Sequence, residues 1–243
     1  MKIDICLSPA LFPTFSADTP PIVVVIDIFR ATTCMCVAFE NGVNSILPIA
    51  DLEKAIQYKQ EGYIVSAERN ALKCSFADLG NSPYDYMDSS LKGRDIIMTT
   101  TNGTQAIDRA QTCDTLLIGS FSNFNTICDY LCRCNSDILF LCAGWNNKVN
   151  MEDTLFAGAA ANEIQNICPG VSCSDTTRIA LSLWKEGRTN LKKFLEPSEH
   201  IQRLQAQNLQ KDIDFCLTLN TTRSLPFLEK ESGLLKNTGR LYE

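Results

Sequence analysis

The fold is decided by the stretch Val23-Val24-Val25-Ile26-Asp27-Ile28-Phe29-Arg30-Ala31-Thr32-Thr33. Its β-branched run ends at a carboxylate, and two hydroxyl residues then open a helical pattern, which predicts a buried strand followed by a helix. Such a turn would place Asp27 at the rim of a sheet and aim Arg30 at the same point as the first N–H groups of the helix. A helix N-terminus attracts anions, so the stretch suits a metal ion and a phosphate ester. Taken alone it is better explained as an ordinary capped helix, and the motifs elsewhere in the chain decide the matter.

Length and composition restrict the class of protein. The 243 residues are 45% hydrophobic and 21% charged, which favours one α/β unit over residues 1–243 or two closely packed α/β lobes. A net charge of −6 argues against nucleic acid or an anionic membrane as partner. No apolar run approaches the roughly 20 residues that cross a bilayer, and the first residues lack a signal peptide, so we expect a cytoplasmic protein. The twelve cysteines form no Cys-x-x-Cys pair and are expected to be free thiols.

Apolar runs alternate with helical patterns along the first two thirds of the chain. This order predicts a largely parallel or mixed sheet with helices on both faces, followed by a helix-rich C-terminal third. Residues 175–186 are predicted as a helix with Ile179 on its buried face, and residues 225–229 as one edge strand. We expect strands at residues 3–7, 22–26, 45–49, 63–67, 95–98, 116–118 and 138–142, and further helices at 31–40, 152–167 and within 198–217.

Polar clusters follow several of these strands directly. Because ligands of such sheets bind beyond the carboxyl ends of the strands, we expect the clusters to meet at one edge. They are Asp27, Glu68-Arg69, residues 99–104, Gly119-Ser120 and residues 142–144.

Three carboxylates at or near this edge predict a cation site. Asp27 and Glu68 end two strands, and Asp153 begins the helix that follows a third. Converging carboxylates repel one another, and Mg²⁺ with several waters is the usual ion between oxygen ligands. Glu152 is more readily explained as an acid that stabilises the first helical turn.

Donor-rich segments around these acids predict an anion site. The loop at residues 99–104 combines hydroxyls, a glycine and a helix start, which suits a phosphate or sulfonate. Arg30 and Arg69 offer bidentate donors. The candidate substrate-binding residues, beside Arg69, are Thr32, Thr33, Asn81, Ser82, Thr100, Thr101, Asn102, Gly103, Thr104 and Gly144. His200, the one histidine, is expected on the surface of a polar helix, remote from every cluster.

Six motifs, in this order, resemble the 2-phosphosulfolactate phosphatase family. The resemblance implies a Mg²⁺-dependent phosphatase that hydrolyses 2-phospho-3-sulfolactate to 3-sulfolactate in coenzyme M biosynthesis. The chain departs from the family at Ala71, where glycine is usual, and at residues 145–148. The motifs are Val25-Ile26-Asp27-Ile28-Phe29-Arg30-Ala31-Thr32-Thr33, Glu68-Arg69-Asn70, Leu79-Gly80-Asn81-Ser82-Pro83, Thr99-Thr100-Thr101-Asn102-Gly103-Thr104, Cys142-Ala143-Gly144 and Glu152-Asp153.

Residues and resemblance together predict Mg²⁺-assisted hydrolysis of a small anionic phosphoester. Asp27 would hold the metal and act as base or nucleophile, with Glu68 as a second acid, and Arg30 would clamp the anion. An aspartyl-phosphate route is the alternative, but the haloacid-dehalogenase phosphatases that use it have a second aspartate where Phe29 stands, which favours attack by metal-activated water.

Two other classes compete with this hypothesis. A sulfonate- or phosphate-sensing module could share the anion clamps without turnover. A dinucleotide oxidoreductase needs a glycine-rich first turn, which residues 27–33 lack. Homo-oligomerisation is left open by the sequence.

Overall fold

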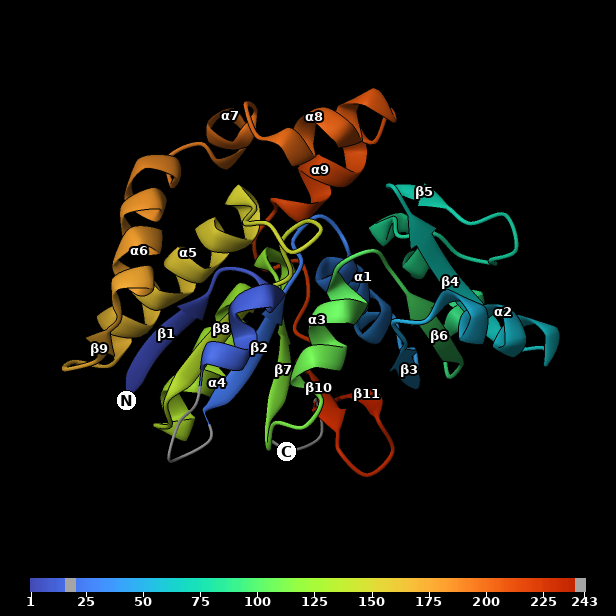
Figure 1. Cartoon of the computed structure of the whole chain (residues 1–243), viewed down its shortest axis with the longest axis horizontal. Coiled ribbons are helices and arrows are strands. Elements are labelled where there is room, and N and C mark those ends of the chain that lie inside the picture. The colour runs from blue at the N-terminus through green and yellow to red at the C-terminus, as the bar shows by residue number, and fades with distance from the viewer. Residues whose placement is uncertain (16–20, 239–243) are drawn as a thin grey trace.

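The computed structural model describes residues 1–15 and 21–238, and its centre is a mixed sheet of eleven strands within those ranges. The strands lie in the order β5-β4-β6-β3-β11-β10-β7-β2-β8-β1-β9 (Figure 1). Their bounds are β1 Lys2–Cys6, β2 Ile22–Ile26, β3 Ser45–Pro48, β4 Ile64–Arg69, β5 Leu72–Lys73, β6 Asp95–Thr99, β7 Leu116–Gly119, β8 Ile138–Cys142, β9 Ser172–Cys173, β10 Pro226–Glu229 and β11 Leu234–Asn237.

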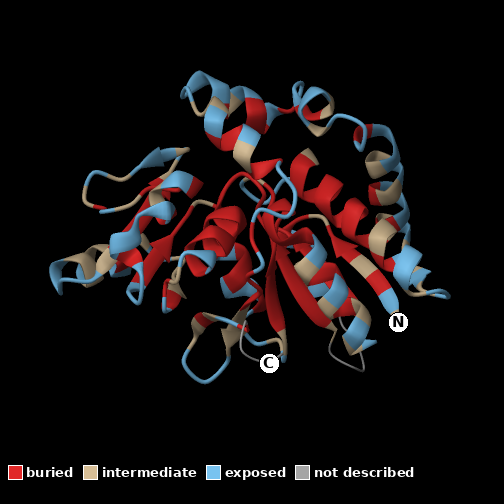
Figure 2. Ribbon diagram, turned by 180° about the vertical axis from the view of Figure 1, so that it is seen from behind, coloured by how far each residue is buried: buried red, intermediate tan, exposed pale blue. Residues whose placement is uncertain are grey.

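Helices cover both faces of the sheet, as the alternation of strands and helices predicts. Val24 and Ile26 of β2 face one apolar core, which contains residues of α4, α5 and α6, whereas Val23 and Val25 face a second core with α1 and α3. The central strands β2, β7 and β8 are buried on both sides, so each has a continuous apolar sequence (Figure 2). The helices are α1 Ala31–Glu40, α2 Leu52–Gln60, α3 Gly103–Ala110, α4 Phe124–Cys134, α5 Met151–Ile167, α6 Asp175–Gly187, α7 Leu191–Leu195, α8 Glu199–Ala206 and α9 Gln210–Cys216.

The sheet consists of two parallel blocks joined by an antiparallel hairpin. Strands β4, β6 and β3 form one block, and β7, β2, β8, β1 and β9 form the other. The hairpin β10–β11 lies between them, pairing with β7 on one side and β3 on the other. The prediction of a single edge strand at residues 225–229 is therefore wrong, because this segment pairs on both sides inside the sheet.

The C-terminal third is helical, and its last helices lie above the carboxyl ends of the strands (Figure 1). The stretch predicted within residues 198–217 is divided into α8 and α9 by a turn, where Asn208 has φ of +58°. Ile179 of α6 is 59% exposed, so the prediction that it is buried is wrong. The next residue, Ala180, is fully buried because its backbone contacts Gly158 of α5.

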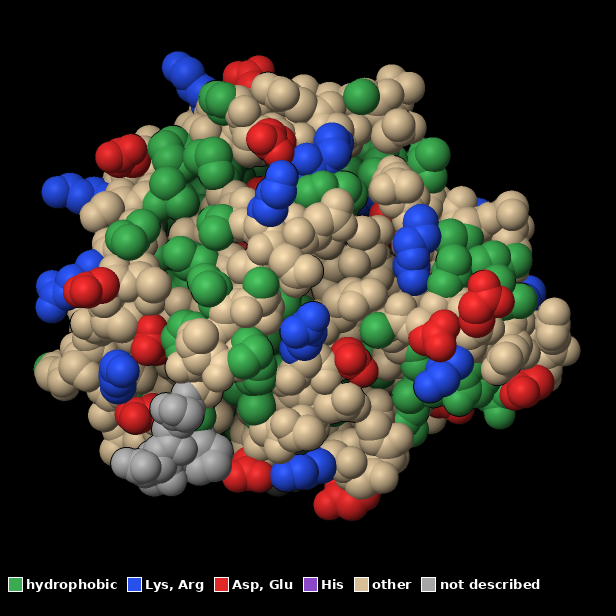
Figure 3. Space-filling model, in the orientation of Figure 1, with side chains coloured by type: hydrophobic (Ala, Val, Ile, Leu, Met, Phe, Trp, Pro, Cys, Tyr) green, Lys and Arg blue, Asp and Glu red, His purple; other side chains and the backbone are tan. Residues whose placement is uncertain are grey.

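Charges of both signs are interspersed on the face shown in Figure 3. Among the described residues, none of the helices combines the length and apolarity needed to span a membrane.

Candidate active site

Asp27 lies in a small cavity at the carboxyl end of β2. The cavity has a free volume of about 10 Å³, enough for about one water. The lining residues come from the segments that follow β2, β5, β6 and β8, from the end of β4 and from α8; they are Asp27, Phe29, Arg30, Glu68, Ala71, Asn81, Asn102, Trp145, His200 and Leu204.

The turn after β2 is shaped by the two threonine hydroxyls that follow it. Thr32 Oγ1 donates to the Asp27 carbonyl at 2.9 Å and accepts from the Asp27 N–H at 3.1 Å. Thr33 Oγ1 donates to the Ile28 carbonyl at 3.1 Å. Both hydroxyls are thus engaged in holding the strand-to-helix turn, and neither threonine lines the cavity.

Burial dominates the electrostatics of Asp27, which is 4% exposed. Burial raises the pKa of this carboxyl from its ordinary value to about 6, and the negative charges of Glu68 and Glu152 add to that shift. His200 and the Ala31 N–H oppose it. A cation beside Asp27 would remove the repulsion that the three carboxylates exert on one another.

Glu68 joins two loops at the site. Its carboxylate accepts from the Ala71 N–H, from the Thr101 N–H at 3.2 Å and from Thr101 Oγ1 at 3.1 Å. The side chain is 5% exposed and also borders the Asp27 cavity. Thr101 therefore holds the Glu68 carboxylate in place and does not present a free hydroxyl to the cavity.

The two arginines occupy different positions. Arg30 is 3% exposed and donates to Asp212 and to the Ala71 carbonyl, both at 2.7 Å. Its Nε finds no partner among the described residues, so one buried donor is available in the cavity wall. Arg69 is half-buried, donates to the Glu68 carbonyl and to Thr99 Oγ1, and does not line the cavity.

The loop between β6 and α3 is capped by its own threonines. Thr100 and Thr104 exchange hydrogen bonds between backbone N–H groups and hydroxyls, at 3.1 and 3.2 Å. Gly103 lies against Asp27, because a Cβ there would come within 2.7 Å of Asp27 Oδ2 and 2.6 Å of Ala31 Cβ. Asn102 lines the cavity and fixes the facing loop by accepting from the Asn146 N–H at 3.1 Å.

Asn81 and Ser82 lie differently with respect to the cavity. Asn81 lines the cavity, and its buried Oδ1 has no hydrogen-bond partner among the described residues. Ser82 donates to Asp212 at 2.9 Å, so it supports the partner of Arg30.

Asp153 is fully buried, but its oxygens are already engaged. Oδ1 accepts from the Ile28 N–H at 2.9 Å, and Oδ2 accepts from the Gly144 N–H at 3.1 Å and from Asn150 Nδ2 at 2.9 Å. Gly144, with φ of +60°, admits no side chain because a Cβ would meet the Lys148 carbonyl oxygen. Asp153 thus links the turn after β2 to the loop after β8 and does not border the cavity.

The donors at the cavity fit a magnesium ion bound largely through water and substrate. Within residues 1–15 and 21–238, no three histidine, cysteine or acidic side chains are arranged to hold a metal. Magnesium commonly takes only one or two carboxylates together with waters and substrate phosphate. The cavity offers that donor set in Asp27 and Glu68, whereas Asp153 does not line it and both of its oxygens accept hydrogen bonds elsewhere.

The expectation that His200 lies on the surface, remote from the site, is wrong. It is 6% exposed, lines the Asp27 cavity, and its Nδ1 lies 2.5 Å from Glu152 Oε1. Glu152 is fully buried, so its role is more than that of an ordinary first-turn acid. A signal for this burial was present: His200 is four residues before Leu204, and both lie on the inner face of α8 with Ile201.

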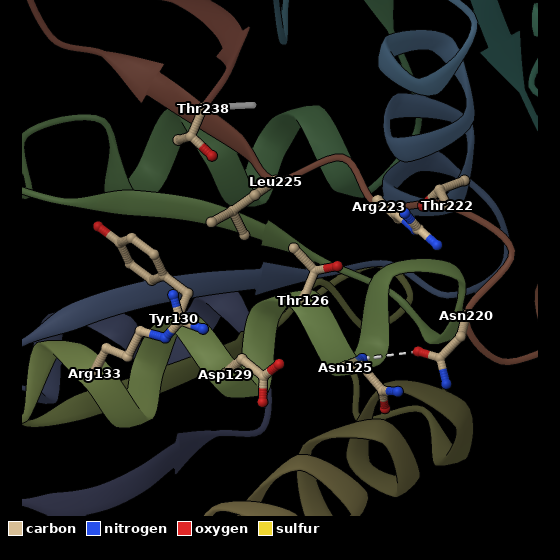
Figure 4. A pocket seen from close by; sticks show the side chains of 10 residues that line it. All are labelled: Asn125, Thr126, Asp129, Tyr130, Arg133, Asn220, Thr222, Arg223, Leu225 and Thr238. Carbon is tan, nitrogen blue, oxygen red and sulfur yellow. Dashed lines mark hydrogen bonds between the residues drawn. The ribbon is translucent and has the colours of Figure 1, made fainter. Parts of the chain in front are cut away.

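A larger cavity lies elsewhere in the molecule. It has a volume of about 480 Å³ and lies between α4 and the segment before β10 (Figure 4). None of the residues identified from the sequence lines it. Its walls are Asn125, Thr126, Asp129, Tyr130, Arg133, Asn220, Thr222, Arg223, Leu225 and Thr238.

Fold and site define the class. Strand-end carboxylates, a buried guanidinium and two helix starts surround one cavity at the carboxyl edge of a mostly parallel sheet, as in an α/β protein that handles a small anion. The chain belongs to the 2-phosphosulpholactate phosphatase family, whose sequence pattern matches residues 6–231. This membership confirms the resemblance and the expected class of phosphoric monoester hydrolase.

Individual relatives agree over most of the chain. A probable 2-phosphosulfolactate phosphatase of Thermotoga petrophila is 34% identical over 213 residues, covering 88% of this chain and 91% of its own. One from Caldanaerobacter subterraneus is 32% identical over 220 residues, covering 89% and 90%. A third, from Gloeothece citriformis, is 32% identical over 241 residues, covering 97% and 99%.

Proposed function

We propose that this protein is a Mg²⁺-dependent phosphatase that hydrolyses 2-phospho-3-sulfolactate, or a closely similar anionic phosphoester, to 3-sulfolactate and phosphate. One observation carries the proposal beyond family membership: two buried carboxylates, Asp27 and Glu68, share a cavity with the buried guanidinium of Arg30. The proposal extends to a cytoplasmic location and a role in coenzyme M biosynthesis.

Asp27 and Glu68 are the residues that would hold Mg²⁺. A magnesium ion there would supply Lewis-acid neutralisation of the phosphoryl oxygens. Glu68 is held in place by three donors from two loops, so little rearrangement is needed to present it.

The anionic groups of the substrate would be bound by the surrounding donors. Arg30 is oriented by Asp212 and keeps its Nε uncommitted, so it can bind a phosphoryl or carboxylate oxygen. The Asn102 and Asn81 side chains line the same cavity and can orient the sulfolactate moiety. These side chains are buried, and the low local dielectric strengthens each of these interactions.

In the hydrolytic step, the Asp27 carboxylate accepts a proton as water attacks phosphorus. Burial raises the pKa of this carboxyl to about 6 in the metal-free protein, and bound Mg²⁺ would lower it again, so the group is ionised at neutral pH in either state. The aspartyl-phosphate alternative predicts retention of configuration at phosphorus, since it uses two displacements, whereas direct attack by water predicts inversion.

Phosphate release from 2-phospho-3-sulfolactate tests the proposal. We expect turnover with Mg²⁺, loss of turnover with EDTA, and recovery when Mg²⁺ is restored. Asp27→Asn should lower kcat by at least 10²-fold in the same assay. Absence of phosphate release from this and simple phosphoesters, together with measurable ligand binding, would instead establish a sensing module.

A further inference from the structure

The one histidine of the chain is fixed as half of a buried acid–imidazole pair at the edge of the proposed active site. His200 Nδ1 and Glu152 Oε1 are 2.5 Å apart, and Glu152 is fully buried in the first turn of α5. No described residue forms a hydrogen bond with the other ring nitrogen, Nε2. A carboxylate on Nδ1 fixes the tautomer and orientation of an imidazole.

Aromatic contacts fix the plane of the imidazole ring. Phe29 meets it edge-on, with ring centroids 5.7 Å apart and planes at 84°. Trp145 lies at 5.8 Å, tilted by 46°, and the Arg203 guanidinium lies 4.1 Å from the centroid of the Trp145 ring. Phe29 and Trp145 line the Asp27 cavity together with His200, so this packing holds the ring at the cavity wall.

The proposed reaction needs a proton donor for the leaving oxygen of the ester. When water attacks phosphorus, the ester P–O bond breaks and its electron pair goes to the lactate oxygen, a strongly basic alkoxide unless it is protonated. Asp27 takes up the proton of the attacking water, and Arg30 and Asn102 are donors that do not give up a proton at neutral pH. His200 is the remaining lining residue suited to supply one.

Resting on the proposed function, we propose that His200 Nε2 donates the proton to the leaving oxygen of the phosphate ester, with Glu152 as the residue that positions it. The proton count balances. Water loses one proton to Asp27, the lactate oxygen gains one from His200, and exchange with solvent restores both groups after the products leave.

The test compares two esters that differ in one atom. The first is 2-phospho-3-sulfolactate, and the second is its analogue with sulfur as the bridging atom, whose thiolate leaving group needs no proton. His200→Asn keeps a donor near Nδ1 and removes Nε2. We expect its kcat on the oxygen ester to fall by about 10²-fold or more, and on the sulfur ester by less than about fivefold.

Two variants separate proton donation from structure. Glu152→Gln, which can still hydrogen-bond His200, should lose less activity than His200→Asn, and again mainly on the oxygen ester. The matched control is Glu199→Gln, because Glu199 lies on the same helix and its side chain is 91% exposed. The rates of this variant on both esters should match those of the parent. Circular dichroism and melting temperature check that each variant folds.

Every outcome bears on one proposal or the other. Equal losses on both esters would show that His200 only orients the substrate, and unchanged rates would remove it from the chemistry. If His200→Asn fails to fold, Glu152→Gln carries the same oxygen-to-sulfur comparison, and equal losses there would again overturn the proposal. If the parent enzyme hydrolyses neither ester with Mg²⁺, the proposed function fails, and the role of His200 in it fails with it.

Discussion

Arg30 and Asp212 form a buried ion pair of 2.7 Å that joins the turn after β2 to α9, across 182 residues of sequence. The side chains are 4% and 6% exposed. Asp212 also accepts from Ser82, and Arg30 also donates to the Ala71 carbonyl. One carboxylate therefore sets the position of the guanidinium in the proposed anion site and fixes the helical C-terminal segment over it.

Removing the Asp212 carboxylate should lower the stability of the protein. In Asp212→Ala the Arg30 charge stays buried without its partner, which typically costs about 3–5 kcal/mol of stability. We expect a corresponding fall in the free energy of unfolding in urea. The rate of phosphate release should fall by at least tenfold, because Arg30 is no longer oriented.

A double variant separates the two effects. Arg30→Met combined with Asp212→Leu replaces the pair by apolar groups of similar volume, which is often neutral for stability. Stability should return toward that of the parent, while activity should stay low. Recovered activity in the double variant would contradict a role for Arg30 in binding the anion.

A methyl group at Gly103 should disturb Asp27 directly. Gly103→Ala would force a Cβ to within 2.7 Å of Asp27 Oδ2 and 2.6 Å of Ala31 Cβ, so Asp27 or α3 must shift. We expect kcat/KM for phosphate release to fall by at least tenfold. Gln105→Ala, an exposed position in the same helix, is the matched control and should leave kcat/KM unchanged.

The raised pKa of Asp27 predicts that metal-free protein loses stability as pH rises. The folded pKa is about 6, whereas an unfolded aspartate titrates near about 3.9. The folded state therefore holds the proton more tightly, and this contribution is full below about pH 4 and lost as pH rises through 6. Two pKa units correspond to about 3 kcal/mol.

Asp27→Asn removes that titration and provides the measurement. In EDTA, the variant should match the parent near pH 4 and exceed it by up to about 3 kcal/mol at pH 7, by urea unfolding. The inactive variant would then be the more stable protein, as expected where function needs a strained site. A stability difference that does not change with pH would contradict the raised pKa.

Magnesium should stabilise the parent through the same residues. A ligand that binds only the folded state raises stability by about 2.7 kcal/mol at a hundred times its dissociation constant. We expect Mg²⁺ to raise the melting temperature of the parent and of Asp153→Asn, but not of Asp27→Asn or Glu68→Gln. A full Mg²⁺ response in Glu68→Gln would assign the second ligand elsewhere.

Local patterns were sufficient for much of the fold and for the centre of the site. The apolar run at residues 22–26 and the helix at Ala31–Glu40 have the predicted bounds, because burial on both faces and helical spacing leave direct marks in the sequence. The convergence of Asp27 and Glu68 followed from one rule about the edge of parallel sheets.

Long-range packing decided what the sequence did not reveal. The spacing of His200 with Leu204 indicates that the histidine faces inward, but no local pattern records the contacts with Trp145 and Phe29 that place it at the cavity. Thr32 and Thr33 are residues of the kind that bind anions, yet their hydroxyls donate to nearby backbone carbonyls instead. The position of β10 within the sheet depends on partners more than a hundred residues away, Leu117 among them.

The β10–β11 hairpin has a consequence for how the protein is made. The strands on either side of it, β3 and β7, are synthesised early, but no described strand joins them until the last residues of the hairpin have left the ribosome. During translation, each block therefore exposes an edge to which any extended chain could add. These edges are paired only once residues 226–237 have been made, so we expect a chain that terminates before residue 226 to leave both edges open and to aggregate.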